Sequence, residues 1–172
     1  MALACSATSG EQSVVGWLLL ISAAHLFMLR VEGSPPSLPS FTSDVAFAIA
    51  RWVNDRSMAF ADSGEGAWPL IDPEGDKRAL QAKVGGFSEG SDHQVWAEGS
   101  WRVPVIYVND WPDRYIHTQR DLPSNLDATK MKRAMFIAAA SGWYLANVDQ
   151  RQVPGLERAM SSTVRFARRL SV

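Results

Sequence analysis

The chain has 172 residues, which is the length of one domain. Its hydrophobic fraction of 47% and charged fraction of 20% are ordinary for a globular protein, and they exclude a disordered, collagen-like or low-complexity chain. The single cysteine, Cys5, excludes an internal disulfide and a cysteine-rich zinc site.

Formal charge is unevenly distributed, although the net value is only −1. Residues 128–172 carry a net +6, whereas residues 1–127 carry a net −7. One interpretation is a pair of solvated faces of opposite sign, and the other is a basic tail that binds nucleic acid. The arginines of the tail fall at helical spacing, as expected for the wet side of a helix. We therefore favour solvated faces and expect no nucleic-acid partner.

Sixteen mostly apolar residues, Val14–Leu29, lie near the start of the sequence. A helix that spans a bilayer needs about 20 residues, and His25 interrupts the segment, so a membrane anchor is the less favoured interpretation. A secretory signal is not indicated, because no lysine or arginine precedes Arg30. We favour a buried helix or strand–helix element; a stretch without a native role, at the edge of a truncated gene, is the third interpretation. Residues 1–32 are set apart as this apolar segment, and residues 33–172 as the domain.

The domain begins with a stiff connection and a helix. Glycine, serine and proline dominate residues 33–39, which predicts a turn-rich link. Apolar residues then recur at helical spacing after Ser43, which predicts an amphipathic helix from there to about Arg56. Residues 62–90 are rich in glycine, proline and acidic residues, so we expect mostly loop, with a short helix near Lys77–Ala82.

A strand and two helices follow. Val103–Val108 is a compact β-branched run with Pro104 at its entry, which predicts a buried strand. Asp127 can cap a helix from Ala128 to about Asn147. The residues expected on its buried side are Met131, Met135, Ala138, Gly142 and Leu145. A last helix is expected to run through Leu156, Met160, Val164 and Ala167.

These elements predict a helix-rich α/β fold with few strands, which is typical of part of a layered sheet. Two loop segments carry the candidate chemistry. The first contains Ser91, Asp92 and His93, where Ser91 or Asp92 can cap a short helix through Trp96. Neighbouring Ser, Asp and His do not by themselves form a triad, so a capped turn with a hydrogen-bonded histidine is the alternative interpretation.

The second segment runs from Asp110 to Leu122, directly after the predicted strand. Ligands of open α/β sheets bind beyond strand ends, and a neutral imidazole such as His117 is a good zinc ligand there. Asp121 or a backbone carbonyl can fix the tautomer of His117. A polar loop with one hydrogen-bonded histidine is the alternative.

The order of these segments resembles the C-terminal part of the zinc-dependent aminopeptidases, the relatives of bacterial leucyl aminopeptidase, glutamate carboxypeptidase and glutaminyl cyclase. The resemblance is clearest over residues 85–145. The segments that carry it, in order, are Gly90-Ser91-Asp92-His93, Val103–Val108, Tyr115-x-His117-Thr118-x-x-Asp121 and Asn125-Leu126-Asp127.

The resemblance implies a partial three-layer α/β/α sandwich and a site for two zinc ions that cleaves N-terminal residues from peptides. His117 corresponds to the last metal ligand, and Asp121 is the candidate that orients it. Ser91, Asp92, His93 and Tyr115 are implied to lie near the site and its peptide substrate. Relatives are often exported, so an extracytoplasmic location fits the resemblance.

The sequence departs from the family before residue 85. The other ligands and the general base come from a His-x-Asp, a Glu-Glu pair and a further Asp, and neither of the two paired motifs occurs here. We therefore expect the C-terminal portion of an exopeptidase, inactive alone, with the upstream half missing. The alternative is a non-catalytic binding or assembly domain. Four tryptophans belong either to an ordinary core and pocket rim or to a surface that a partner or second copy covers: Trp96, Trp101, Trp111 and Trp143.

Overall fold

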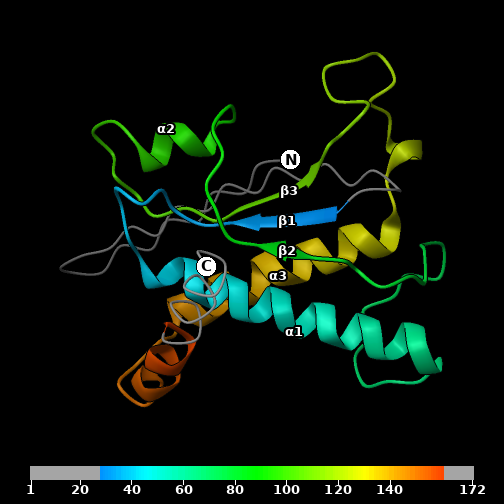
Figure 1. Cartoon of the computed structure of the whole chain (residues 1–172), viewed down its shortest axis with the longest axis horizontal. Helices are drawn as coiled ribbons and strands as arrows, with labels where there is room; N and C mark the ends of the chain where they lie inside the picture. Colours follow the sequence, from blue (N-terminus) through cyan, green and yellow to red (C-terminus); the bar gives the residue numbers. More distant parts are fainter. Residues whose placement is uncertain (1–27, 161–172) are drawn as a thin grey trace, which may run out of the picture.

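A computed structural model describes residues 28–160 of the chain. Three strands alternate with helices along this part of the sequence (Figure 1). The elements in order are β1 (Met28–Glu32), α1 (Phe41–Ser63), β2 (Lys83–Val84), α2 (His93–Ala97), β3 (Tyr107–Trp111), the 3-10 turn η1 (Pro123–Asn125) and α3 (Ala128–Ala146). Residues 153–160 are also helical.

The three strands form one mixed sheet in the order β2-β1-β3. β1 runs parallel to β2, with Arg30 opposite Lys83. β1 runs antiparallel to β3, with Met28 opposite Trp111 and Glu32 opposite Tyr107. The predicted class, a helix-rich α/β fold with few strands, is confirmed at this level.

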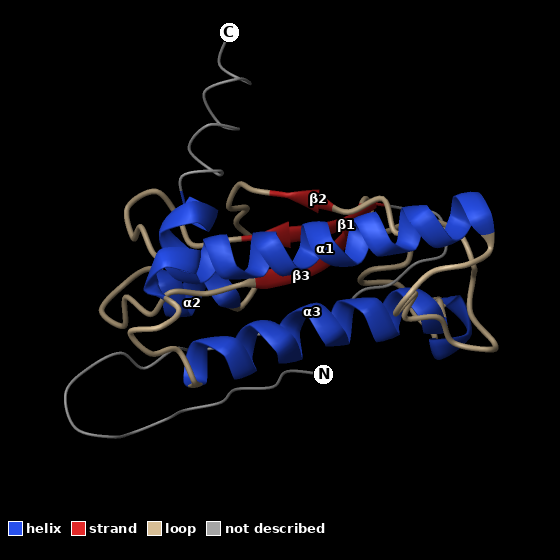
Figure 2. Cartoon of the chain, turned by 90° about the horizontal axis from the view of Figure 1, so that it is seen from below, coloured by secondary structure: helices blue, strands red, loops and turns tan. Residues whose placement is uncertain are grey.

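α1 and α3 pack against each other and cover one face of the sheet (Figures 1 and 2). Because side chains alternate along a strand, Leu29 and Val31 point into this layer and are fully buried, whereas Arg30 and Glu32 point to the opposite face. The core between sheet and helices is completed by Val45, Ala46, Phe47, Ala50, Val53, Leu80, Ile106, Val108, Ala134, Ile137 and Leu145.

The first helix is longer than predicted at both ends. Its N-cap is Ser40, whose side chain accepts a hydrogen bond from the Thr42 backbone N–H. The hydroxyl of Ser43 accepts instead from the Ser34 backbone N–H, and so ties the preceding connection to α1. The helix ends at Gly64, which adopts the left-handed conformation that favours glycine.

The short helix predicted near Lys77–Ala82 does not form. The Leu80 N–H donates to Ser57 Oγ at 2.9 Å, and the Ala82 N–H donates to Asn54 Oδ1 at 2.9 Å. Side chains of α1 therefore satisfy backbone groups that a local helix would pair internally. This arrangement ties the segment to α1 and leads it into β2.

The predicted strand Val103–Val108 is shifted, because β3 begins only at Tyr107. Its partner β1 ends at Glu32, opposite Tyr107, so residues before Tyr107 lie past the end of the ladder. Val103 and Val105 are buried as expected, but their N–H groups donate to the Trp96 carbonyl and to Ser34 Oγ.

The predicted bounds of the second long helix are confirmed, and its buried stripe is displaced. Asp127 caps α3 by accepting from the Lys130 N–H at 2.6 Å. Met135 was expected to be buried but is 54% exposed. Most of the buried residues lie one position earlier in the sequence than predicted. The buried residues are Thr129, Lys130, Arg133, Ala134, Ile137, Ser141 and Leu145.

Two predicted segments extend beyond the described residues. Of Val14–Leu29, only Met28 and Leu29 are described, and they begin β1; the last helix is described only as far as Met160, so Val164 and Ala167 lie outside. Across residues 28–160, none of the helices has the length and apolar character that crossing a membrane requires.

Candidate functional site

A buried carboxylate organises one end of the sheet. Glu32, the last residue of β1, is fully buried on the face opposite α1 and α3. Its Oε2 accepts from the Ser88 N–H at 2.8 Å and from Ser88 Oγ at 2.6 Å. Its Oε1 accepts from Asn109 Nδ2 at 3.4 Å and pairs with Arg30 at 3.0 Å. We refer to Glu32, Ser88, His93, Tyr107 and Asn109 as the Glu32 pocket.

The imidazole of His93 lies at the centre of the aromatic contacts in the Glu32 pocket. The ring is fully buried, stacks on Tyr107 at 4.1 Å between centroids and meets the edge of Phe87 at 5.2 Å. Its Nε2 lies 2.7 Å from the Ser88 carbonyl, which can only accept, so we assign the proton to Nε2. Nδ1 has no hydrogen-bond partner within the described residues. Burial lowers the pKa of His93, so the ring is neutral near pH 7.

The two residues before His93 lie at the rim of the pocket. Ser91 is half-buried and hydrogen-bonds the Tyr107 side chain, while burial raises the pKa of that phenol. Asp92 is exposed and occupies the N-cap position of α2, but its side chain makes no capping hydrogen bond there. Asp92 therefore stands at the predicted N-cap position but does not cap the helix with its side chain.

β3 leads directly into the loop that contains His117, as the sequence predicts for a strand that precedes a site. We refer to residues 112–122 as the His117 loop. Asp113 Oδ1 accepts from the Tyr115 N–H at 2.8 Å, and Thr118 Oγ1 donates to the Tyr115 carbonyl at 2.6 Å. His117 is exposed and has a φ of 61°, a left-handed conformation that is uncommon outside glycine.

The predicted site residues do not come together. Because β3 is antiparallel to β1, the Glu32 pocket and the His117 loop lie at opposite ends of the sheet (Figure 1). The structure brings Ser91 and His93 together at the first end, and it places Tyr115 and His117 at the second. Asp121 is exposed, and its N–H donates to the Thr118 carbonyl at 3.2 Å.

No group of three or more His, Cys, Asp or Glu side chains in residues 28–160 is arranged to hold a metal ion. Within this part of the chain His117 can occupy a single coordination position. The role of Asp121 in orienting the His117 ring stays a prediction.

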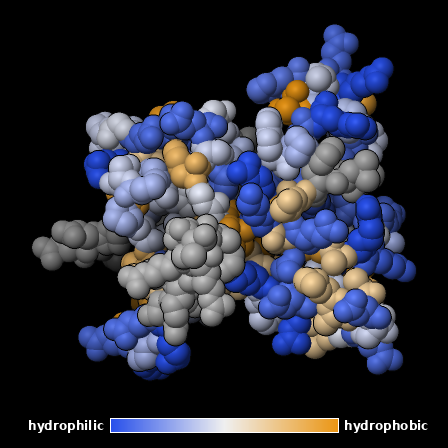
Figure 3. Space-filling model, viewed as in Figure 1, coloured by the Kyte–Doolittle hydropathy of each residue, from blue (hydrophilic) through white to orange (hydrophobic). Residues whose placement is uncertain are grey.

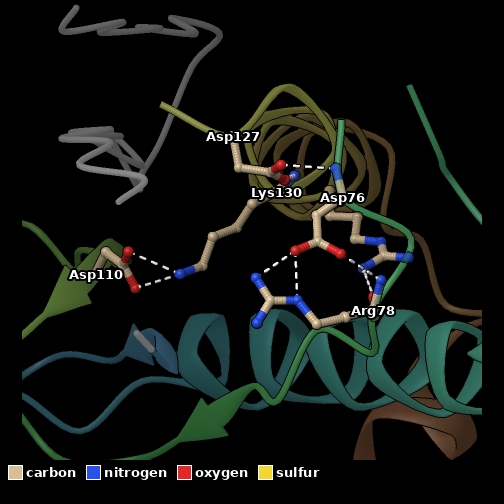
Figure 4. A network of polar contacts seen from close by, with 6 residues as sticks. Asp76, Arg78, Asp110, Asp127 and Lys130 are labelled. Carbon is tan, nitrogen blue, oxygen red and sulfur yellow. Dashed lines mark hydrogen bonds and ion pairs between the residues drawn. The ribbon is translucent and has the colours of Figure 1, made fainter. Parts of the chain in front are cut away.

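A buried ion pair joins β3 to α3 beneath the His117 loop (Figure 4). Lys130 Nζ lies 2.6 and 2.7 Å from the two carboxylate oxygens of Asp110, and both side chains are almost fully buried. Burial lowers the pKa of Lys130, and the Asp110 carboxylate opposes that shift. Asp110 precedes the loop and Lys130 follows it, so the pair closes the loop at its base.

Asp127 connects this base to a distant segment. Its Oδ1 caps α3, and its Oδ2 accepts from the Asp76 N–H at 2.7 Å (Figure 4). Asp76 pairs with Arg78, which lowers the pKa of that carboxyl. Arg133, also buried, donates to the Arg78 carbonyl at 2.8 Å. The sequence pattern does not reveal this network, because an apolar stripe is the usual signal of a buried helix face, and the buried face of α3 includes Lys130 and Arg133.

Outside the Glu32 pocket, residues 28–160 form hollows at two further places of interest. One, of about 570 Å³, lies within the His117 loop and is lined by Arg114, Tyr115, Thr118, Gln119 and Arg120. The other, of about 380 Å³, lies between α1 and α3 and is lined by Ala48, Ile49, Trp52, Phe136 and Ala140. Charged and polar residues line the first, and apolar residues line the second.

No family model, curated protein or solved structure matches the chain.

Proposed function

We propose that this chain supplies the C-terminal part of a zinc-dependent exopeptidase domain, with His117 as one zinc ligand, and that it is inactive alone. One observation carries the proposal: β3 emerges at the sheet edge into an exposed loop with His117 available, in the motif order of the resemblance. Open α/β sheets bind ligands beyond the carboxyl ends of their strands. The His117 loop follows the carboxyl end of β3, which is also the amino end of the parallel strands β1 and β2. The three-layer sandwich of such enzymes is part of the same proposal.

The site fits one zinc ligand and requires others. Zinc sites in enzymes use three protein ligands and leave a position for water. His117 can offer an imidazole nitrogen, and the ion pair of Asp110 and Lys130 fixes the base of its loop. When bound, zinc supplies the Lewis acid that polarises a peptide carbonyl and activates water. Under this proposal, the remaining ligands and the general base come from outside residues 28–160.

Zinc titration monitored by imidazole NMR signals tests the ligand assignment. The chain has three histidines, so the signals of His25, His93 and His117 can be assigned by substitution. We expect zinc to shift the His117 signals weakly, and His117→Ala to abolish the response. His25→Ala is the matched control and should leave the His117 response intact. Binding that survives His117→Ala would overturn the assignment.

Hydrolysis of an amino-acid anilide by the purified chain tests the second half of the proposal. We expect the purified chain to show no chelator-sensitive hydrolysis of the anilide. Robust, chelator-sensitive turnover by the chain alone would show that it holds a complete site. The nucleotide sequence upstream of Met1 is an independent check, because a frame encoding His-x-Asp and Glu-Glu would supply the expected partners.

A second candidate, a non-catalytic assembly domain, is favoured by the apolar surface of the helix layer. Trp52 and Phe136 stack at 6.0 Å beside the apolar hollow, and Trp143, 70% exposed, lies on the same side of α3 as Phe136. We expect a partner or a second copy to cover this surface if the candidate holds. Sedimentation velocity would then show a dimer that Trp143→Lys dissociates and that Trp68→Lys, at an equally exposed tryptophan, leaves intact. A monomer at all concentrations, unaffected by either change, contradicts self-assembly.

A further inference from the structure

The hollow within the His117 loop is lined by residues that carry hydrogen-bond donors. Arg114 and Arg120 carry guanidinium groups, and Tyr115 and Gln119 carry a phenol and an amide. The two carboxylates of the loop, Asp113 and Asp121, are not among the lining residues. Figure 3 shows this part of the surface as a largely hydrophilic lobe that projects at the upper right. The lining therefore has a positive character although the loop as a whole is balanced in charge.

Hydrogen bonds within the loop hold its backbone in place. Thr118 Oγ1 donates to the Tyr115 carbonyl and accepts from the Arg120 N–H at 3.1 Å. Asn125 Nδ2 donates to the Arg120 carbonyl at 2.5 Å. Asp113 accepts from the N–H groups of Tyr115 and Ile116, which fixes the start of the loop. A site held in this way loses less conformational entropy when a ligand binds.

We propose that this hollow binds a carboxylate of a peptide, with Arg114 and Arg120 as its principal partners. A guanidinium group is planar and can donate two parallel hydrogen bonds to a carboxylate. A carboxylate therefore fits a lining with two arginines better than a neutral ligand does. His117 lies between Tyr115 and Thr118 in the same loop. One part of the inference rests on the proposed function, namely the substrate class. The peptides that are cleaved would carry a carboxylate close to the scissile bond. The binding itself does not require zinc.

Two sources of carboxylate share this chemistry, namely an acidic side chain and a peptide C-terminus. Three blocked tripeptides distinguish them: N-acetyl-Ala-Glu-Ala-amide, N-acetyl-Ala-Gln-Ala with a free C-terminus, and N-acetyl-Ala-Gln-Ala-amide as the neutral control. Each is titrated into the full chain in the presence of EDTA, and backbone amide shifts of residues 114–120 report binding. EDTA separates this test from the proposed function, because a failure to bind zinc cannot produce a failure here.

We expect at least one of the two charged peptides to bind and the neutral peptide not to bind. Arg114→Gln and Arg120→Gln should each weaken binding about fivefold, as for exposed charge pairs. Lys83→Gln removes an exposed positive charge on β2 and should leave binding unchanged. Raising the salt from 0.05 to 0.5 M should weaken binding about threefold or more. Equal binding of the neutral peptide, or wild-type affinity in both arginine variants, would overturn the proposal.

Discussion

The two ends of the sheet differ in how they use a histidine and the charges around it. In the Glu32 pocket, His93 is enclosed by aromatic rings and by polar groups that are already paired. In the His117 loop, the imidazole is exposed, and fixed charge is buried only at the base, in the pair of Asp110 and Lys130. The first end is therefore built to stay closed. At the second end, the buried ion pair below the loop provides the stabilising contact, and the His117 side chain is exposed to solvent.

Breaking the buried pair should have the largest effect. Lys130→Met leaves Asp110 buried without its counter-ion, so we expect the free energy of unfolding to fall by about 3–5 kcal/mol. Urea denaturation measures this. Lys132→Met, on the exposed side of α3, is the control and should cost less than about 1 kcal/mol. The double variant Asp110→Leu with Lys130→Met should recover most of the loss, and a double variant no better than Lys130→Met would contradict this account.

Neutralising the buried carboxylate at the other end should have the next largest effect. In Glu32→Gln, one donor-bearing amide nitrogen faces donors of Ser88 or Arg30, so we expect a loss of about 1–3 kcal/mol in the free energy of unfolding. The exposed Glu89→Gln, in the same loop as Ser88, is the matched control and should be neutral. Equal stability of the two variants would show that the Glu32 contacts do not hold this end closed.

The pH dependence of stability should sharpen the comparison between the histidines. Because burial holds the pKa of His93 below its usual 6.5, the unfolded chain binds more protons than the folded chain as pH falls below about 6.5. His93 therefore lowers the free energy of unfolding towards acid pH, by at most about 1.4 kcal/mol per pH unit, until the folded pKa is passed.

Denaturation at pH 7.5, 6.5 and 5.5 tests this prediction. His93→Phe keeps a stacking ring and removes the titrating group, so its stability should fall less steeply than wild type between pH 6.5 and 5.5. Parallel pH profiles for wild type and His93→Phe would contradict the burial of a neutral ring.

The smallest effect is expected in the His117 loop. His117→Ala removes an exposed side chain, so the free energy of unfolding should change by no more than about 0.5 kcal/mol. Thermal denaturation of the variant measures this. A larger loss would mean that the ring packs against the body of the protein and is not free to bind a ligand.

Local signals in the sequence predicted much of the fold. The periodicity after Ser43 and the cap at Asp127 identified both long helices, because those signals act within one or two turns. The exact strand bounds depend on pairing between distant segments, and the end of β1 at Glu32 decides where β3 begins. The displaced stripe of α3 has a similar cause, since Lys130 is buried only because β3 places Asp110 opposite it.

The candidate site was predictable only residue by residue. The sequence correctly indicated that β3 feeds the loop of His117, and that His93 begins a short helix. It contained no signal that β3 runs antiparallel to β1, and this direction separates the two segments. The role of Glu32 was also hidden, because a single glutamate at the end of a short strand resembles any exposed carboxylate until its contacts with Ser88, Asn109 and Arg30 are known.

The central strand has consequences for how the protein is made. Met28 pairs with Trp111, a residue synthesised 83 positions later. At about 5–20 residues per second, a ribosome needs roughly 4–17 s to reach that partner. Throughout this interval Leu29 and Val31 lack the β3 edge that completes their surroundings. One edge of this strand therefore stays unpaired while those 83 residues are synthesised, and a chaperone that covers it would protect it from aggregation.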